Sequence, residues 1–410
     1  MDDQNDRVLI TVTGRDRAGI TATLTGILAE QGATLHDIEQ VVVQGQLTLC
    51  LLVGLSHARD VLKELLFAAK ELGLELDFNP VSPAANGAGS AAGQTGARSA
   101  SEAAGRRYVI TAIGRSLGAD ALHALARTLA TESANIEKIS RLSEDTLASV
   151  EIHASLPPGR DREALKRSLL AVATKTGFDV SLQRESLYRR SKRMVVMDMD
   201  STLIRIEVID ELARAAGVGE AVSKITERAM QGEMDYDESL RQRVGLLAGL
   251  DVKVLDQIAN DLPLTEGAET LVRVLKRLGY KTAVISGGFS RAAEALKRRL
   301  GIDYAFSNNL EVEGGKLTGR VVGPIVNAQR KAELLDLIAQ HEGVLLDQVI
   351  AVGDGANDAL MLEKAGLGIA FRAKPKLREK ADTSISGAGL DAILYLLGLS
   401  GRELQEVDFG

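Results

Sequence analysis

The sequence of 410 residues contains no tryptophan and few other aromatic residues, with seven Phe and six Tyr. Leu, Val, Ile and Ala must therefore fill its cores, and little is available for the aromatic stacking surfaces that bind single-stranded nucleic acids. The formal net charge of −7 also argues against a polyanionic partner, because binding to phosphate groups needs a basic face. We therefore expect no nucleic-acid partner.

Long apolar runs and cysteines are also scarce. No uninterrupted apolar run approaches the roughly 20 residues of a membrane-spanning helix, and the first residues contain neither the basic nor the apolar segment of a signal peptide. The single cysteine, Cys50, excludes an internal disulfide and any metal site built from several cysteines. These absences favour a cytoplasmic location and no membrane partner.

Composition divides the chain into segments. Residues 81–106 are mostly Ala, Gly and Ser and include no aromatic residue, which predicts a flexible linker. A basic, polar stretch around 184–193 predicts a solvated connection ahead of a new apolar run. We therefore expect two small domains at 1–80 and 107–184 and a larger one at 185–410.

The two small segments resemble each other. Residues 8–15 (VLITVTGR) match residues 108–115 (YVITAIGR), and each copy continues as strand, helix, two strands, helix, strand. In the first copy the helices are expected at 18–31 and 59–72, the hairpin at 41–53 and the last strand at 74–78. This order is that of the split βαβ, or ferredoxin-like, fold.

Each copy also has a glycine-containing turn between its first strand and first helix, and so resembles the ACT domain, a sensor of small molecules. The resemblance implies that the turn around Asp16 and Gly19 binds L-serine or another amino acid where two such domains pair, within a homodimer. The second turn, from Gly114 to Gly118, lacks the acidic residue. The alternative is that these glycines provide turn geometry only.

Polar motifs follow three short apolar runs of the larger segment, which are typical of buried parallel strands. The runs are residues 194–197, 282–285 and 349–352. They are followed by Asp198-Met199-Asp200-Ser201-Thr202, by Ser286-Gly287-Gly288 and by Gly353-Asp354-Gly355-Ala356-Asn357-Asp358. Strand alternation would place Asp198 and Asp200 on one side, and Lys331 begins a predicted helix at 331–340. Ligands bind at the carboxyl ends of such strands, so we expect a phosphate and metal site there.

The order Asp-x-Asp-x-Thr, Ser-Gly-Gly, Lys and Gly-Asp-Gly-x-Asn-Asp resembles the haloacid dehalogenase superfamily of phosphotransferases, over about residues 192–400. The resemblance implies an α/β fold class with a Rossmann-like core. It also implies that Asp198 attacks phosphorus to form an aspartyl-phosphate and that Asp200 acts first as general acid and then as general base.

The same resemblance implies a Mg²⁺ cofactor, which prefers oxygen ligands. Asp198, the backbone carbonyl of Asp200 and Asp354 would hold the metal, with Asp358 supporting them. The substrate's phosphoryl end would contact a second set of groups, which neutralise charge as it develops. That set is Ser286, Gly287, Gly288, Lys331 and Asn357.

Residues 207–263 form a predicted helical cap between the core segments 192–206 and 264–400, with helices at 208–216, 221–231, 236–248 and 252–260. The cap resembles that of superfamily members that hydrolyse O-phospho-L-serine to L-serine, the last step of serine biosynthesis. This resemblance implies that Glu207 binds the substrate ammonium and Arg243 its carboxylate, with Met230 and Tyr236 lining the pocket. Most such members have Phe where this chain has Tyr236.

Two alternatives remain open at this stage. The chain could act on a related phospho-amino acid or transfer phosphate to another alcohol, such as homoserine. It could also be an amino-acid-sensing regulatory protein with a vestigial phosphatase segment. The presence of every expected catalytic residue favours an enzyme over the second alternative.

Overall fold

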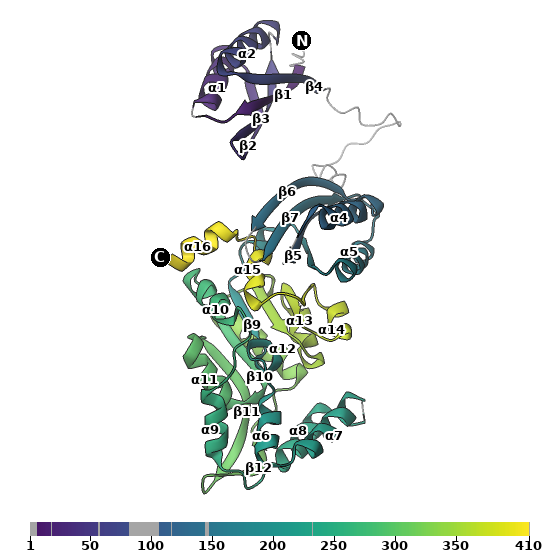
Figure 1. Cartoon of the computed structure of the whole chain (residues 1–410), viewed down its shortest axis with the longest axis vertical. Helices are drawn as coiled ribbons and strands as arrows, with labels where there is room; N and C mark the ends of the chain where they lie inside the picture. The colour runs from purple at the N-terminus through teal and green to yellow at the C-terminus, as the bar shows by residue number, and fades with distance from the viewer. Residues whose placement is uncertain are drawn as a thin grey trace, which may run out of the picture. The chain divides into compact units, whose positions relative to one another are not determined.

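The computed structural model describes residues 6–17, 19–55, 58–81, 106–115, 117–143, 147–231 and 233–409. They belong to two compact units, unit 1 (Met1–Gly96) and unit 2 (Ala97–Gly410), both drawn in Figure 1. The predicted linker, apart from its two end residues, lies outside the described residues. Among the helices described, none is long and apolar enough to cross a membrane.

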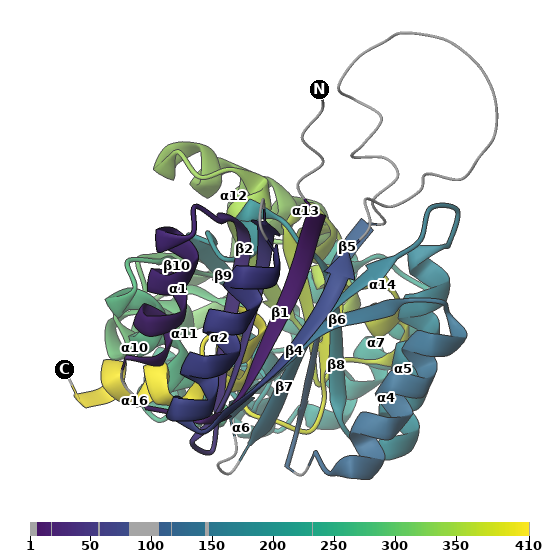
Figure 2. The ribbon, with the colours of Figure 1, turned by 90° about the horizontal axis from the view of Figure 1, so that it is seen from above.

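Unit 1 has a four-stranded antiparallel sheet in the order β2-β3-β1-β4. Its strands are β1 (Asp6–Arg15), β2 (Thr34–Val43), β3 (Gln46–Leu55) and β4 (Leu74–Val81). Helices α1 (Ile20–Glu30) and α2 (Ala58–Leu72) lie side by side on one face of the sheet (Figure 2). Alternate residues of β1 and β3 pack against these helices, so the predicted ferredoxin-like order is confirmed.

Unit 2 begins with the same arrangement. Strands β5 (Arg106–Gly114), β6 (Asn135–Ser143), β7 (Ala148–Leu156) and β8 (Asp179–Arg184) pair in the order β8-β5-β7-β6. Helices α4 (Ala119–Thr131) and α5 (Arg162–Thr176) complete this second ferredoxin-like part. The sequence repeat is therefore a repeat of fold.

The rest of unit 2 is built on a mostly parallel sheet with the order β12-β11-β10-β9-β13-β14-β15. The strands are β9 (Met194–Met197), β10 (Lys281–Phe289), β11 (Tyr304–Glu313), β12 (Lys316–Val322), β13 (Val349–Gly353), β14 (Leu367–Phe371) and β15 (Thr383–Ile385). The helices are α10 (Ala268–Arg277), α11 (Ser290–Leu300), α12 (Ala328–Glu342), α13 (Ala359–Lys364), α14 (Pro375–Lys380), α15 (Ile393–Leu396) and α16 (Gly401–Phe409). All four residues of β9 are buried because this strand is central, which explains its unbroken apolar run.

The two sheets of unit 2 are continuous. Thr383 of β15 pairs with Ser181 of β8, so that the strands form one eleven-stranded sheet. Beside this junction the carboxylate of Asp179 accepts hydrogen bonds from the backbone N–H groups of Ser386, at 2.8 Å, and Gly387, at 3.1 Å. The second ferredoxin-like part is thereby fixed to the larger one by strand pairing and by the Asp179 side chain.

Side chains fix the same junction. The buried Lys166 donates to the carbonyl oxygen of Ala381 at 2.6 Å. Arg189 is only 4% exposed and forms an ion pair with the buried Glu151 of β7. The prediction of a solvated connection at 184–193 is therefore wrong for Arg189 and for Lys192, which is also buried. A charge pattern shows that cations are present but does not show which anions the fold brings to them.

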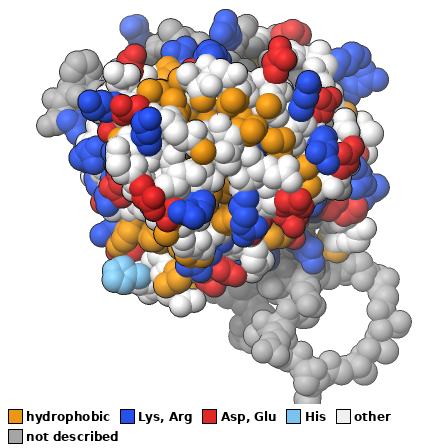
Figure 3. Space-filling view, turned by 90° about the horizontal axis from the view of Figure 1, so that it is seen from below, with side chains coloured by type: hydrophobic (Ala, Val, Ile, Leu, Met, Phe, Trp, Pro, Cys, Tyr) orange, Lys and Arg blue, Asp and Glu red, His pale blue; other side chains and the backbone are white. Residues whose placement is uncertain are grey.

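The cap consists of α6 (Val208–Ala215), α7 (Gly219–Met230), α8 (Tyr236–Gly245) and α9 (Val252–Asn260), close to the predicted helices (Figure 1). The α8–α9 connection is bound to β12 through the backbone, since Leu317 O accepts from Gly249 N at 2.8 Å and Leu317 N donates to Leu250 O at 2.9 Å. Seen from below Figure 1, acidic and basic side chains are interspersed around hydrophobic areas (Figure 3).

Candidate active site

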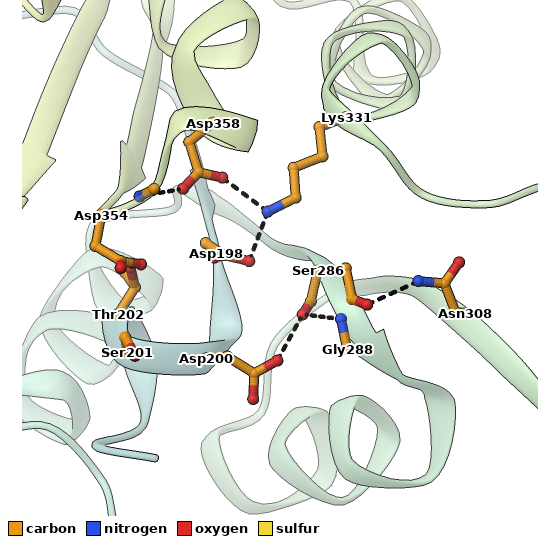
Figure 4. Close-up of polar contacts among 12 residues, drawn as sticks. Asp198, Asp200, Ser201, Thr202, Ser286, Gly288, Asn308, Lys331, Asp354 and Asp358 are labelled. Carbon is orange, nitrogen blue, oxygen red and sulfur yellow. Dashed lines mark hydrogen bonds and ion pairs between the residues drawn. The ribbon is translucent and has the colours of Figure 1, made fainter. Parts of the chain in front are cut away.

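Strand β9 places Asp198 at the carboxyl edge of the sheet, where its backbone N–H donates to Val352 O of the neighbouring β13 at 2.9 Å. The Asp198 side chain is buried, and its Oδ1 accepts a hydrogen bond from Lys331 Nζ at 2.7 Å. Lys331 is 0% exposed and also donates to Asp358 Oδ1 at 2.7 Å (Figure 4). One buried ammonium thus joins two buried carboxylates.

Helix α12 positions Lys331 in its first turn. Asn327 caps this helix by accepting a hydrogen bond from Arg330 N at 3.0 Å. The helix therefore begins at Ala328, three residues before the predicted start. Burial disfavours the Lys331 ammonium, but the carboxylates of Asp198 and Asp358 outweigh this and raise the pKa of Lys331. Lys331 consequently remains charged.

Asp198, Asp354 and Asp358 bring carboxylate oxygens within 4.8 Å of one another. Thr202 donates to Asp354 Oδ1 at 3.0 Å and orients that group. Burial, followed by repulsion from Asp358, raises the pKa of Asp354 to about 7; burial and Asp358 likewise raise the pKa of Asp198 against the opposing charge of Lys331. A crowded cluster of oxygen donors fits a divalent cation such as Mg²⁺, which relieves this repulsion.

Asp200 has different surroundings from Asp198. The strand ends at Met197 and residues 199–203 form a tight turn, in which Ser201 has a φ of 58°, so strand alternation does not extend to Asp200. Asp200 Oδ1 accepts from Val208 N at 3.0 Å, and its Oδ2 accepts from Ser286 Oγ at 3.4 Å. Burial, with repulsion from Glu207, raises the pKa of Asp200 to about 7. Such a carboxyl group exchanges a proton readily near neutral pH.

The Ser286-Gly287-Gly288 segment lies at the end of β10, next to Asp200. Ser286 Oγ accepts a hydrogen bond from Gly288 N at 2.8 Å (Figure 4). A Cβ atom on Gly287 would collide with the hydroxyl of Tyr236, and one on Gly288 would collide with the Asp200 carboxylate. Close approach therefore explains both glycines.

The cap contributes Glu207, which directly precedes α6 and accepts a hydrogen bond from Ser201 Oγ at 2.7 Å. Burial raises the pKa of Glu207, while this hydrogen bond and the charge of Arg243 oppose the rise. Arg243 is half-buried in the last turn of α8, where its Nε donates to Ser239 O at 3.3 Å.

The remaining predicted residues lie as follows. Tyr236 begins α8, and its hydroxyl donates to Gly287 O at 3.3 Å; burial raises the pKa of Tyr236 to about 12. Asn357 is half-buried in the turn after β13. Met230 ends α7, and its side chain lies outside the part that the structure describes.

Asp16 and Gly19 lie on an exposed turn of unit 1, where Gly19 precedes α1 with a φ of 98°.

The structure brings two further residues to the site, Thr202 and Asn308, to which the sequence assigns no role of their own. Thr202, within the quoted Asp-x-Asp-x-Thr motif, orients Asp354, so the motif itself was the available signal. Asn308 of β11 is 1% exposed and donates to Gly287 O at 2.8 Å. The sequence offers no such signal for Asn308, because nothing in it distinguishes this buried residue from the next asparagine, Asn309, which is exposed.

Comparisons with known proteins agree with this fold and this edge of the sheet. The family model for haloacid dehalogenase-like hydrolases matches residues 192–366, and two ACT-domain models match residues 6–79 and 107–183. A haloacid dehalogenase-family hydrolase from Salmonella enterica has a TM-score of 0.63 at 32% identity, covering 71% of this chain and 98% of that one. The chain is therefore a haloacid dehalogenase-like hydrolase with two ACT domains.

Matches to curated relatives define a narrower family. Phosphoserine phosphatase from Streptomyces coelicolor is 41% identical over 406 residues, covering 98% of this chain and 94% of the relative. Phosphoserine phosphatase SerB2 from Mycobacterium tuberculosis is 43% identical over 412 residues, covering 98% and 96%. The unliganded crystal structure of a probable phosphoserine phosphatase from Vibrio cholerae has a TM-score of 0.59 at 36% identity, covering 73% of this chain and 88% of that chain. The chain belongs to the phosphoserine phosphatase family.

Proposed function

We propose that this enzyme hydrolyses O-phospho-L-serine to L-serine and phosphate with Mg²⁺, as the last step of serine biosynthesis. The observation that carries the proposal is the division of labour between two nearby carboxyl groups. Asp198 is paired with the Lys331 ammonium, whereas Asp200 is hydrogen-bonded to Val208 N and Ser286 and has a pKa of about 7. The first arrangement suits a nucleophile and the second a proton donor and acceptor.

In the first step, Asp198 Oδ2 attacks phosphorus, because Oδ1 is engaged by Lys331. A bond forms between Oδ2 and phosphorus as the ester bond breaks, and Asp200 gives its proton to the departing serine oxygen. In the second step, the Asp200 carboxylate takes a proton from water while the water oxygen attacks phosphorus. The bond to Asp198 breaks, and phosphate leaves with both carboxyl groups restored.

Lys331, Ser286, the backbone amide of Gly287 and Asn357 would hold the phosphoryl group, and Gly288 would support Ser286 through its backbone N–H. Asp198, Asp354 and the backbone carbonyl of Asp200 would hold Mg²⁺, and Asp358 would support them through Lys331. When bound, Mg²⁺ supplies positive charge that offsets the negative charge of the phosphoryl and carboxylate oxygens.

The cap would select the amino-acid end of the substrate. Glu207 and Arg243 carry opposite charges, as a zwitterion requires, so Glu207 would bind the ammonium and Arg243 the carboxylate. Met230 and Tyr236 would line the remaining wall. The test is phosphate release from a panel of phosphorylated amino acids with and without Mg²⁺. Phosphoserine should be hydrolysed fastest, and formation of phosphohomoserine in added homoserine would indicate phosphotransfer instead.

We further propose that unit 1 binds L-serine or another amino acid at the turn around Asp16 and Gly19, where ACT domains pair in a homodimer. Edge strand β2 supports pairing, because all ten of its residues are exposed, including Leu35, Ile38 and Val43. We also propose that the domains span residues 1–80, 107–184 and 185–410, with a linker between the first two. We propose a cytoplasmic location for the enzyme.

A further inference from the structure

A closed ring of hydrogen bonds joins the cap to the core beside the candidate phosphate site. Three segments of the core and the first turn of cap helix α8 contribute to it. The members are Tyr236 and Asp237 of α8, Gly287 of β10, Asn308 of β11, and Val326 and Asn327 ahead of α12.

The Gly287 carbonyl is the meeting point of cap and core. It accepts one hydrogen bond from Asn308 Nδ2 at 2.8 Å, drawn in Figure 4, and another from the Tyr236 hydroxyl at 3.3 Å. Asn308 is 1% exposed, so its amide group has been withdrawn from water to make this contact. Two donors from two different elements therefore fix one carbonyl group.

The ring closes on the helix that carries Lys331. Asn308 Oδ1 accepts from Val326 N at 2.8 Å, and the next residue, Asn327, donates from Nδ2 to Asp237 Oδ1 at 3.0 Å. The oxygen of the same Asn327 amide caps α12. The first turn of α8 is thus hydrogen-bonded both to the Ser-Gly-Gly segment and to the start of α12.

Fixing the Gly287 carbonyl also fixes the Ser286 hydroxyl. The peptide bond between Gly287 and Gly288 is planar, so its N–H is oriented together with its carbonyl. That N–H donates to Ser286 Oγ at 2.8 Å, and Ser286 in turn donates to Asp200 at 3.4 Å. Hydrogen bonds in such a chain strengthen one another.

We propose that Tyr236 and Asn308 are positioning residues that hold the Gly287–Gly288 peptide and, through the Gly288 N–H, the Ser286 hydroxyl in place beside the phosphoryl group. This inference rests on the proposed role of the Ser-Gly-Gly segment in phosphate binding. Tyr236 then does more than line the pocket, since its hydroxyl makes the phosphate site depend on the position of α8.

The principal test replaces Asn308 by Asp, which keeps the size and the acceptor for Val326 N but turns a carboxylate oxygen toward the Gly287 carbonyl. The matched control is Asn309→Asp, the same change at the next, exposed residue of β11. Two quantities are measured with Mg²⁺ present: kcat for phosphoserine and the inhibition constant of inorganic phosphate. Inorganic phosphate has no amino-acid part, so it reports on the phosphate site alone.

For Asn308→Asp we expect kcat to fall and the inhibition constant of phosphate to rise, each by about tenfold or more, because a buried acceptor loses its donor. Asn309→Asp should stay within twofold of the parent. Partial unfolding would lower the apparent kcat but leave the inhibition constant unchanged. An unchanged inhibition constant in Asn308→Asp, or equal losses in Asn309→Asp, would overturn the proposal.

Tyr236→Phe tests the cap side and keeps the aromatic ring in place. We expect phosphate inhibition to weaken about three- to tenfold through loss of one hydrogen bond. Should Asn308→Asp fail to fold, this variant decides alone, and a change of less than twofold in the inhibition constant rejects the proposal. A parent enzyme that releases no phosphate from phosphoserine would instead reject the proposed function, so the two failures are distinguishable.

Discussion

Lys331 Nζ lies 2.7 Å from Asp198 Oδ1, and this ion pair is buried at the carboxyl edge of the sheet. It holds the expected nucleophile in one orientation, and the ammonium opposes the rise in the pKa of Asp198 that burial causes. The first prediction concerns the nucleophile itself. Asp198→Asn preserves the shape and an acceptor for Lys331 but removes the attacking carboxylate, so turnover of phosphoserine should fall at least 1000-fold, about 4 kcal/mol.

Steady-state phosphate release measures this loss, with deamidation of the new Asn excluded by mass spectrometry. Asp261→Asn is the matched control, the same change at an exposed residue after α9, and should remain fully active. A tenth of parental activity in Asp198→Asn would contradict covalent catalysis by this residue.

The second prediction concerns Mg²⁺ and pH. In the folded protein the pKa of Asp354 is raised to about 7, above the value of about 3.9 for an unfolded aspartate. The metal-free protein should therefore lose stability from this group as pH rises from about 4 to about 7. Mg²⁺ requires the carboxylate form, so its stabilising effect should be larger at pH 8 than at pH 5.5.

Thermal unfolding with Mg²⁺ or with EDTA at both pH values provides the measurement. In Asp354→Asn the Mg²⁺-dependent rise in Tm should be small at either pH. A rise in the parent that is as large at pH 5.5 as at pH 8 would argue that these carboxylates do not bind the metal.

The third prediction separates recognition from chemistry. Arg243→Ala should lower kcat/KM for phosphoserine, because it removes one side of a desolvated charge pair with the substrate carboxylate. The expected loss of transition-state binding free energy is roughly 2–5 kcal/mol. Phosphoethanolamine lacks that carboxylate and should be hydrolysed almost as before. Arg241→Ala, at an exposed position of the same helix, is the control. Equal losses on both substrates would mean that Arg243 supports the cap and not the substrate.

The fourth prediction concerns the effector. Serine is also the reaction product, so inhibition alone does not identify a second site. In Arg243→Ala, product binding at the active site should be weakened, and calorimetry should still detect L-serine binding to the turn of unit 1. Adding Asp16→Ala should abolish the remaining heat of L-serine binding. If L-serine at this turn regulates the enzyme, it should change the activity about 5- to 150-fold. Persistent binding in the double variant would place the effector elsewhere.

The sequence predicted the parts of the site that follow from short, local patterns. Continuous apolar runs identified the buried strands, and the polar residues after them, such as Asp198 and Asp354, lie together because parallel strands end at one edge. The orientation of Asp200 was not predictable from alternation, because the chain leaves the strand at Met197. That turn gives Asp200 partners of its own.

Contacts between distant segments left no comparable signal. Arg189 belongs to a stretch that looks like a solvated connection, and only the fold reveals that Glu151 is its partner. The sequence gives Asn308 the appearance of an ordinary strand residue. Its role in the hydrogen-bonded ring depends on Gly287 and Val326, which belong to other segments. Buried polar residues of this kind are recognised by their partners and not by their spacing in the sequence.

The shared sheet of unit 2 has a consequence for protein engineering. Removing the residues that precede β9 would expose β15 as an open sheet edge and leave the Ala381 carbonyl without the Lys166 ammonium. Open edges of this kind promote association between copies. The second ACT domain and the catalytic part therefore do not behave as interchangeable modules, and a chimaera that joins this catalytic part to a foreign sensor should retain residues 106–184.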